Sequence, residues 1–175
     1  SKAVPSIFTG PAASPIVYGQ TLGQAVLTGG SASVPGTFTF TTPNLTPNAG
    51  LASASVTFTP SSLANYLTTT GTISVLVNKA VPAIEIAPTA TPITYGQTIG
   101  TSTLSAGSAS VSGSFTFSTP DVAPNIGTSM QTVVFTPNDG VNFLASNVQV
   151  SVLVNPAPPL FSEKFEGFTG GGFNG

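Results

Sequence analysis

The sequence lacks several residue types on which protein chemistry commonly depends: it has no cysteine, histidine, tryptophan or arginine, and only 5% of its residues are charged. Without cysteine no disulfide can form, and without histidine or cysteine the many hydroxyl groups lack the usual partners of a nucleophilic triad. Three lysines cannot line a phosphate backbone, which excludes a nucleic-acid-binding surface. No apolar run approaches the ~18 residues of a membrane span, so we expect no membrane insertion.

What the sequence does contain is an internal repeat. The stretch Val56–Pro60 returns as Val133–Pro137, at an offset of 77 residues (133 − 56), and the landmarks around it keep that offset without an insertion. A fixed period of this kind indicates consecutive copies of one structural unit. The sequence therefore predicts one repeat in residues 1–78, a second in residues 79–157, and a tail in residues 158–175.

The first copy begins with short extended segments. Residues 2–15 are interrupted by prolines, which predicts an edge strand broken into two pieces. Residues 16–21 form a short strand closed by a glycine turn, and residues 22–28 are the next candidate strand. Pro35 and Gly36 fit the second and third positions of a type II turn.

The rest of the copy alternates between apolar and hydroxyl side chains. Residues 37–41 place Phe38 and Phe40 on one face, and residues 44–50 form a loop. The two remaining strands are expected to point Ala54, Val56, Phe58, Ile73, Val75 and Val77 inward. Short strands, closely spaced turns and no helical period predict an all-β fold of two antiparallel sandwiches.

These motifs together resemble a known family. Tyr-Gly-Gln-Thr, Val-Pro-Gly-Thr-Phe-Thr-Phe, Pro-Asn-Ala-Gly, Val-Thr-Phe-Thr-Pro, Ala-Asn-Tyr and Val-Asn-Lys-Ala are similar to the bacterial immunoglobulin-like repeats of large surface and secreted proteins, the MBG-type or group 3 Ig-like repeats. The resemblance covers residues 2 to about 157. It implies tandem Ig-like sandwiches, an extracellular or cell-surface location on a bacterium, and a role as one link in an array. It implies no catalytic residues.

The positions of the acidic residues in the sequence do not indicate a catalytic or metal-binding site. Glu85, Asp121 and Asp139 all lie in the second copy, and the first copy contains no acidic residue. A calcium site takes six or more oxygen ligands including several carboxylates, and a site that served the module would occur in both copies. We therefore predict no catalytic residue, no cofactor-binding residue, no metal ligand and no cofactor. We interpret Asp121 and Asp139 as turn residues in place of Asn44 and Ser62.

Four other features have a functional and a structural interpretation. A Lys–Asn isopeptide bond would join Lys2 or Lys79 to the closing Asn78 or Asn155, but the first copy has no acid to assist it, and parallel pairing would put the partners at opposite ends of the module. A junction lysine in solvent is favoured.

Tyr66 fits a tyrosine corner, although Phe143 replaces it in the second copy. Tyr18 and Tyr95 could stack on a sugar, but packing at the core or rim is favoured. The glycosylation sequon at Asn44 is replaced by Asp121 in the second copy and is given little weight.

The tail differs in composition: Phe161–Phe168 holds three of the eight charged residues. We interpret it as the opening strand of a following domain, with an edge strand donated to a neighbouring chain as the alternative. Residue 1 has no signal-peptide character, so we expect the chain to be a segment of something longer.

The linker between the copies, Val77–Pro82, has no glycine, and Pro82 restricts both itself and Val81. We expect an elongated, semi-rigid pair, with Leu76 and its counterpart Leu153 covering a small contact between modules. The leading hypothesis is a non-catalytic spacer of a bacterial surface protein, whose partners are neighbouring Ig-like repeats. The alternative is a module that binds a glycan or a host protein through exposed strand edges or loops.

Overall fold

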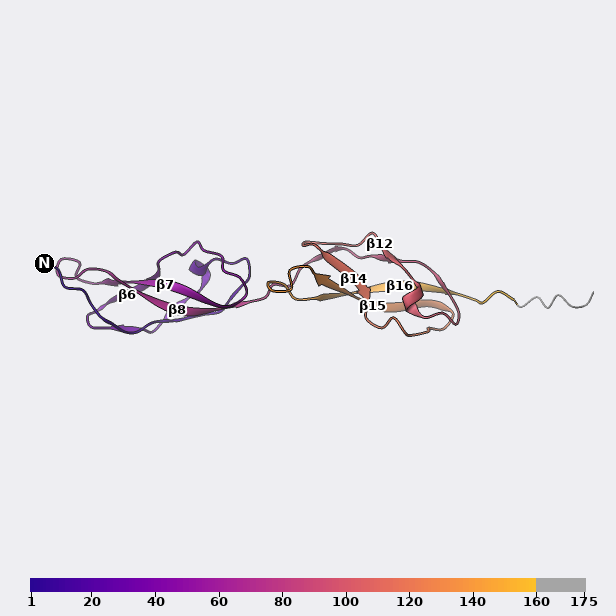
Figure 1. Cartoon of the computed structure of the whole chain (residues 1–175), viewed down its shortest axis with the longest axis horizontal. Helices are drawn as coiled ribbons and strands as arrows, with labels where there is room; N and C mark the ends of the chain where they lie inside the picture. The colour runs from indigo at the N-terminus through magenta and orange to yellow at the C-terminus, as the bar shows by residue number, and fades with distance from the viewer. Residues whose placement is uncertain (160–175) are drawn as a thin grey trace, which may run out of the picture.

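The computed structural model describes residues 1–159. It has an all-β fold in which two small sandwiches follow one another end to end (Figure 1). The prediction of two tandem β-sandwiches is confirmed. The predicted tail lies, from residue 160 onward, outside the described residues.

Each repeat is built on one four-stranded sheet. In the first repeat the order is β3-β8-β7-β6, and in the second it is β11-β16-β15-β14. The outer strands β3 and β11 run parallel to β8 and β16, and the other pairs are antiparallel. The strands are β3 (Ile16–Val17), β6 (Gly36–Phe40), β7 (Gly50–Pro60) and β8 (Thr69–Asn78), followed by β11 (Ile93–Thr94), β14 (Gly113–Phe117), β15 (Gly127–Pro137) and β16 (Ser146–Asn155).

The facing layer of each sandwich consists of short ribbons. In the first repeat β1 (Ile7–Thr9) pairs with β5 (Ser31–Ala32), and β2 (Ala12–Ala13) pairs with β4 (Leu27–Thr28). In the second, β9 (Ile84–Ile86) pairs with β13 (Ser108–Ala109), and β10 (Thr89–Ala90) pairs with β12 (Leu104–Ser105). The break between β1 and β2 at Gly10–Pro11 confirms the predicted interruption of the first strand, because proline cannot donate to the ladder.

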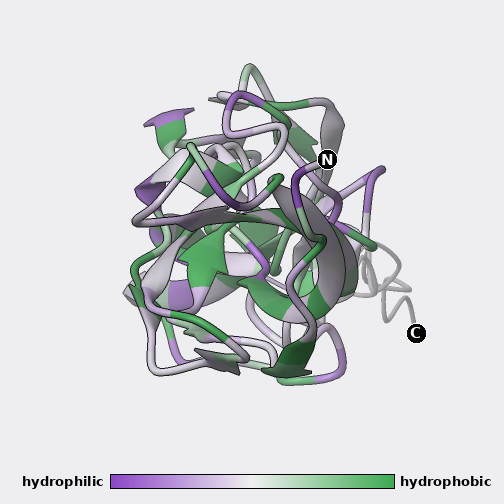
Figure 2. Cartoon of the chain, turned by 90° about the vertical axis from the view of Figure 1, so that its left-hand side faces the viewer, coloured by the Kyte–Doolittle hydropathy of each residue, from purple (hydrophilic) through white to green (hydrophobic). Residues whose placement is uncertain are grey.

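The core lies between the sheet and the ribbons. The alternation of β7 buries Ala54, Val56 and Phe58, and β8 buries Val75 and Val77 against Leu22 and Ile16. Phe40 is buried, whereas Phe38 is half-buried and packs against Phe58 with ring centroids 5.0 Å apart. Viewed along the long axis, the hydrophobic segments gather in the interior and most of the surrounding loops are pale or hydrophilic (Figure 2).

Two local predictions were wrong. Residues 22–28 begin not with a strand but with the 3₁₀ turn η1 (Leu22–Gln24), repeated as η2 (Ile99–Thr101). Leu22 and Ala25 are both buried, and their spacing of three residues fits a turn better than a strand. Gly36 has no positive φ and so does not form a type II turn. Glycine is required there for space, because a Cβ would lie 2.4 Å from both the Phe58 ring and the Thr59 carbonyl oxygen.

Candidate functional site: the junction between the repeats

The linker between the repeats is held from both sides. β8 ends at Asn78, whose carbonyl accepts a hydrogen bond from the Tyr18 N–H at 2.8 Å. Ala80 already belongs to the second repeat, since its N–H donates to the Asn142 carbonyl and its own carbonyl accepts from the Leu144 N–H, both at 2.9 Å. Only Lys79 stands between these two sets of backbone bonds, so the linker has almost no slack.

The second repeat meets the first with a corner loop, residues 139–143. Asp139 shapes this loop, because its Oδ1 accepts hydrogen bonds from the N–H groups of Val141 and Asn142 at 3.2 and 3.1 Å. Short acidic side chains favour such turns by bonding to backbone two or three residues ahead. Lys79 fastens the same loop from the linker, since its Nζ donates to the Gly140 carbonyl at 2.6 Å.

Asn142 joins the two repeats through its side-chain amide. Its Oδ1 accepts from the Ala49 N–H at 2.8 Å, and its Nδ2 donates to Asn48 Oδ1 at 3.4 Å and to Asp139 Oδ2 at 2.8 Å. A backbone N–H and a carboxylate on opposite sides leave one sensible orientation of the amide. The residue is only 6% exposed, so these bonds satisfy a polar group that would otherwise be costly to bury.

An aromatic contact lies beside this amide. The rings of Tyr18 and Phe143 meet edge to face, with centroids 5.3 Å apart and planes at 80°. Such a pair contributes about 0.5–1.5 kcal/mol beyond its buried area. The Tyr18 ring also packs against the core of its own repeat, so it is a bridge between the first core and the second repeat.

The Tyr-Gly-Gln motif places this ring. The Gln20 N–H donates to the Val17 carbonyl at 2.9 Å, and Gln20 Oε1 accepts from the Val17 N–H at 2.7 Å. Gly19 has φ +93°, which suits glycine at the third position of a type II turn. The turn therefore holds Tyr18 at the end of the module that faces the next repeat.

The pKa of Asp139 is lowered from its ordinary value. The main cause is the hydrogen bond from the Asn142 side chain. Desolvation is the next largest effect and raises the pKa, but the backbone N–H groups of Asn142 and Val141 and the charge of Lys79 lower it further. The ionised carboxylate is thus the form that the corner loop stabilises.

The junction contact differs from the predicted one. Leu76 is 46% exposed and its counterpart Leu153, at the far end of the second repeat, is 47% exposed, so the neighbouring repeat does not cover Leu76. The prediction failed because β8 reaches the junction with its end and not with its face. The contact is made instead by loop residues: Tyr18, Asn48 and Ala49 on one side, Asn142 and Phe143 on the other.

The structure separates the remaining candidates. Ala3 pairs with Tyr66, whereas Asn78 lies beside Val17 at the other end of the repeat, which opposes an isopeptide bond between Lys2 and Asn78. Glu85, Asp121 and Asn44 are exposed at separate places. Within residues 1–159 no group of three or more acidic, histidine or cysteine side chains could hold a metal ion, and no helix is long and apolar enough to cross a membrane.

A shallow hollow recurs on both repeats. In the first repeat it has a volume of about 590 Å³ beside Phe38 and Gly30, and in the second about 430 Å³ beside Phe115 and Gly107. Both are lined by small, uncharged residues and by phenylalanine rings. These linings offer no acid, base or charged group for chemistry.

No model of a known protein family matches this sequence. No curated protein matches it either. Among solved structures, the chain is similar to Drosophila N-cadherin EC1-3, with a TM-score of 0.31 and 11% identity over 89% of this chain and 69% of that one. It is also similar to Drosophila N-cadherin EC1-4, with a TM-score of 0.30 and 11% identity over 86% of this chain and 50% of that one. At this level the similarity carries no functional inference, and the fold assignment rests on strand order and register.

Proposed function

We propose that this chain is a non-catalytic spacer, a pair of links from the stalk of a bacterial extracellular or cell-surface protein. Residues 1–78 and 79–157 are the two links, and neighbouring Ig-like repeats are their partners. The bacterial location rests on the resemblance of the sequence motifs to bacterial Ig-like repeats. The spacer role rests on the junction.

The observation that carries this proposal is the shortness of the linker between the backbone hydrogen bonds of the two repeats. Lys79 alone separates the last backbone bond of one repeat from the first of the next, and Asn142 and Phe143 add contacts across the gap. A linker with glycine-rich slack would behave as a flexible coil. A linker held at both ends instead transmits the direction of one repeat to the next, which is the property that a stalk requires.

The test is to loosen the linker. Three glycines inserted after Asn78 should shorten and broaden the end-to-end distribution in small-angle scattering, with little change in the unfolding of each repeat. The matched control is the same insertion after Asn155, the corresponding position at the far end, which should leave the distance between the two repeats unchanged. A compact, near-spherical envelope for the unmodified chain would rule out the spacer role.

The second candidate function is binding of a glycan or a protein. It is favoured by the hollow that recurs beside Phe38 and Phe115. Its uncharged lining suits an uncharged ligand, so titration with neutral oligosaccharides, followed by NMR, is the direct test. Shifts confined to the residues of the hollow would support binding, and unchanged spectra at millimolar ligand would oppose it.

A further inference from the structure

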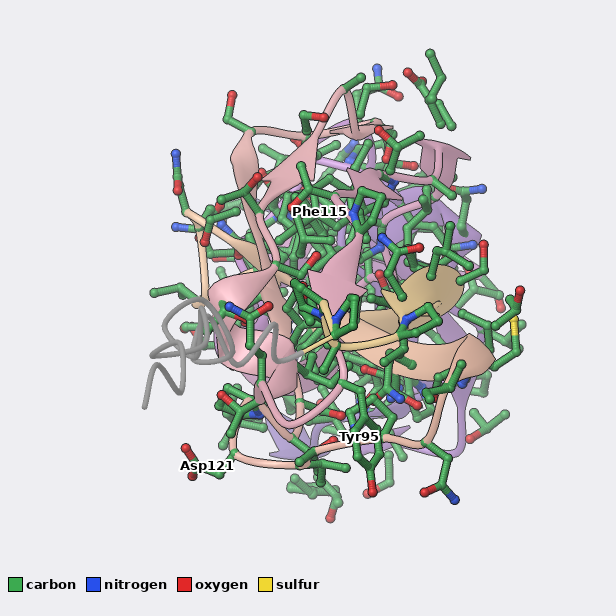
Figure 3. The ribbon with its side chains drawn as sticks, turned by 90° about the vertical axis from the view of Figure 1, so that its right-hand side faces the viewer. Tyr95, Phe115 and Asp121 are labelled. Atoms are coloured by element: carbon green, nitrogen blue, oxygen red, sulfur yellow. The ribbon has the colours of Figure 1, made fainter. Side chains whose placement is uncertain are left out.

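The far end of the second repeat, as described by residues 79–159, has the same geometry as the junction face of the first. The Thr94 N–H donates to Gln97 Oε1 at 2.7 Å, Gly96 has φ +94°, and the Tyr95 N–H donates to the Asn155 carbonyl at 2.8 Å. These values match those around Tyr18 at the junction. Tyr95 is therefore held in the same position, but it lies near the lower edge of the end of the molecule that faces the viewer in Figure 3, and the residue is 51% exposed.

Two further positions complete this end face. Asn125 and Ile126 stand, at the offset of 77 residues, where Asn48 and Ala49 contact Asn142 in the junction. Asn125 is exposed, and Ile126 is 56% exposed. The isoleucine retains the backbone N–H that position 49 donates and adds apolar surface. Within residues 1–159, no repeat lies against this face.

The opposite end of the first repeat has a corner that corresponds to residues 139–143 of the second repeat. Its corner has the same backbone bonds as residues 139–143: the Tyr66 N–H donates to the Ser62 carbonyl at 3.1 Å, and the Ala3 N–H donates to the Asn65 carbonyl at 2.9 Å. Asn65 Nδ2 donates to Ser62 Oγ at 3.3 Å, as Asn142 Nδ2 does to Asp139. Asn65 is exposed, whereas Asn142 is buried, and the difference coincides with the presence of a neighbouring repeat.

We propose that the face formed by Tyr95, Asn125 and Ile126 docks a further repeat of the same kind, whose corner presents an asparagine followed by an aromatic residue. This inference rests on the spacer function and names the partner of the far end of the second repeat. The occupant is a repeat because the established junction already shows this pairing of surfaces. The sequence after Asn155 also keeps Ala157 at the position of Ala80, whose N–H and carbonyl clamp the corner of the second repeat.

The docking explains why the pairing tolerates the two substitutions at these positions. Exchange of Phe143 for Tyr66 retains the ring that meets the tyrosine edge to face. Exchange of Asp139 for Ser62 retains an acceptor for the asparagine amide. The contact itself is small, so covalent linkage in series, which raises the effective concentration of the partner to about the millimolar range, is what makes it form.

The experiment joins the chain to a second copy of itself. Asn155 of the first copy is followed directly by Lys2 of the second, which reproduces the order Asn78-Lys79 and retains both repeats of each copy. In the original chain, the chemical shifts of the Tyr18 ring protons should be displaced from their ordinary values because the ring contacts Phe143. The ring protons of Tyr95 should have nearly ordinary chemical shifts. In the joined chain, Tyr95 of the first copy should gain shifts like those of Tyr18.

Two variants of the joined chain are the controls. Ile126→Asp in the first copy changes an exposed side chain, so the repeat should fold while the Tyr95 shifts return to their original values. Tyr66→Ala in the second copy should have the same effect by removing the ring. If Tyr95 keeps its original shifts in the joined chain while Tyr18 keeps its own, the docking inference is wrong and the internal junction stands. Ordinary chemical shifts for the Tyr18 ring protons in the original chain would instead count against the spacer function.

Discussion

Substitution of Asn142 by alanine tests the junction most directly, because the repeat supplies its own control. Asn142→Ala removes the acceptor of the Ala49 N–H and the donor to Asp139, in a place where the side chain is almost fully enclosed. Leaving a buried polar group without its partner costs about 1–3 kcal/mol. Asn65→Ala removes the corresponding corner bond to Ser62 from an exposed site, where substitutions usually change stability by less than about 0.5 kcal/mol.

The population of the docked junction follows from the energies of the interactions that cross it. Two hydrogen bonds cross the junction, and the shorter one, from the Ala49 N–H to Asn142 Oδ1, contributes about 0.5–1.5 kcal/mol. Together with the aromatic pair, at about 0.5–1.5 kcal/mol, it gives a coupling of at least about 1–3 kcal/mol between the repeats. A coupling of that size is roughly a 5- to 150-fold preference for the docked arrangement. Asn142→Ala should remove about half of the coupling and so let the repeats swing apart in a measurable fraction of molecules.

The assay is a distance distribution between the repeats. Because the chain has no cysteine, Thr39→Cys and Thr116→Cys, both at exposed strand positions, accept spin labels without competing sites. Asn142→Ala should broaden the distribution obtained by double electron–electron resonance, and Asn65→Ala should leave it unchanged. Equal effects of the two substitutions, on either the distances or the free energy of unfolding, would refute the assignment of Asn142 as the residue that joins the repeats.

The other predictions concern the core, a close approach and pH. Phe58→Ala and Phe135→Ala, at side chains 2% and 1% exposed, should each lower the free energy of unfolding by about 3–5 kcal/mol; denaturant titration measures this, and a loss below about 1 kcal/mol would contradict the core. Gly36→Ala places a Cβ 2.4 Å from the Phe58 ring and should cost about 1–3 kcal/mol by overpacking, and a neutral effect in the same titration would show that the ring can move. The folded pKa of Asp139 lies below its ordinary value of 3.8, so the contribution of its carboxylate to stability is present above that pH and is lost as the pH falls through the lowered pKa. The distribution of spin-label distances should broaden in that pH range, and Asp139→Asn should remove this pH dependence.

The regular part of the fold could be predicted because it depends on a period of two. Alternation along residues 53–59 and 70–77 assigned Val56, Phe58 and Val75 to the inner face, and the structure buries all three. The 3₁₀ turn after Thr21 was missed because its short apolar pattern was assigned to a strand. Gly36 was misinterpreted because a glycine needed for a close approach cannot be distinguished in sequence from one needed for a turn.

The junction could not be predicted, because its residues follow no period. Tyr18, Asn48 and Asn142 come from three separate loops, and only the three-dimensional course of the chain brings them together. One signal was available: Tyr18, Asn48 and Asn65 recur unchanged as Tyr95, Asn125 and Asn142, although none of them belongs to the alternating core pattern. Identity between copies at positions outside the alternating pattern indicates a task shared by the two ends of the module.

The polar group at the centre of this junction has a consequence that an apolar contact alone would not have. An edge-to-face ring pair permits a range of rotations about the linker, because its energy changes gradually with angle. The bond from the Ala49 N–H to Asn142 Oδ1 is directional and weakens steeply when it is misaligned. The rings therefore hold the two ends in contact, while the amide fixes the rotation of one repeat relative to the next. In the array that we propose, successive junctions with the same residues would repeat the same rotation, and a single asparagine in each repeat would give the array a regular twist.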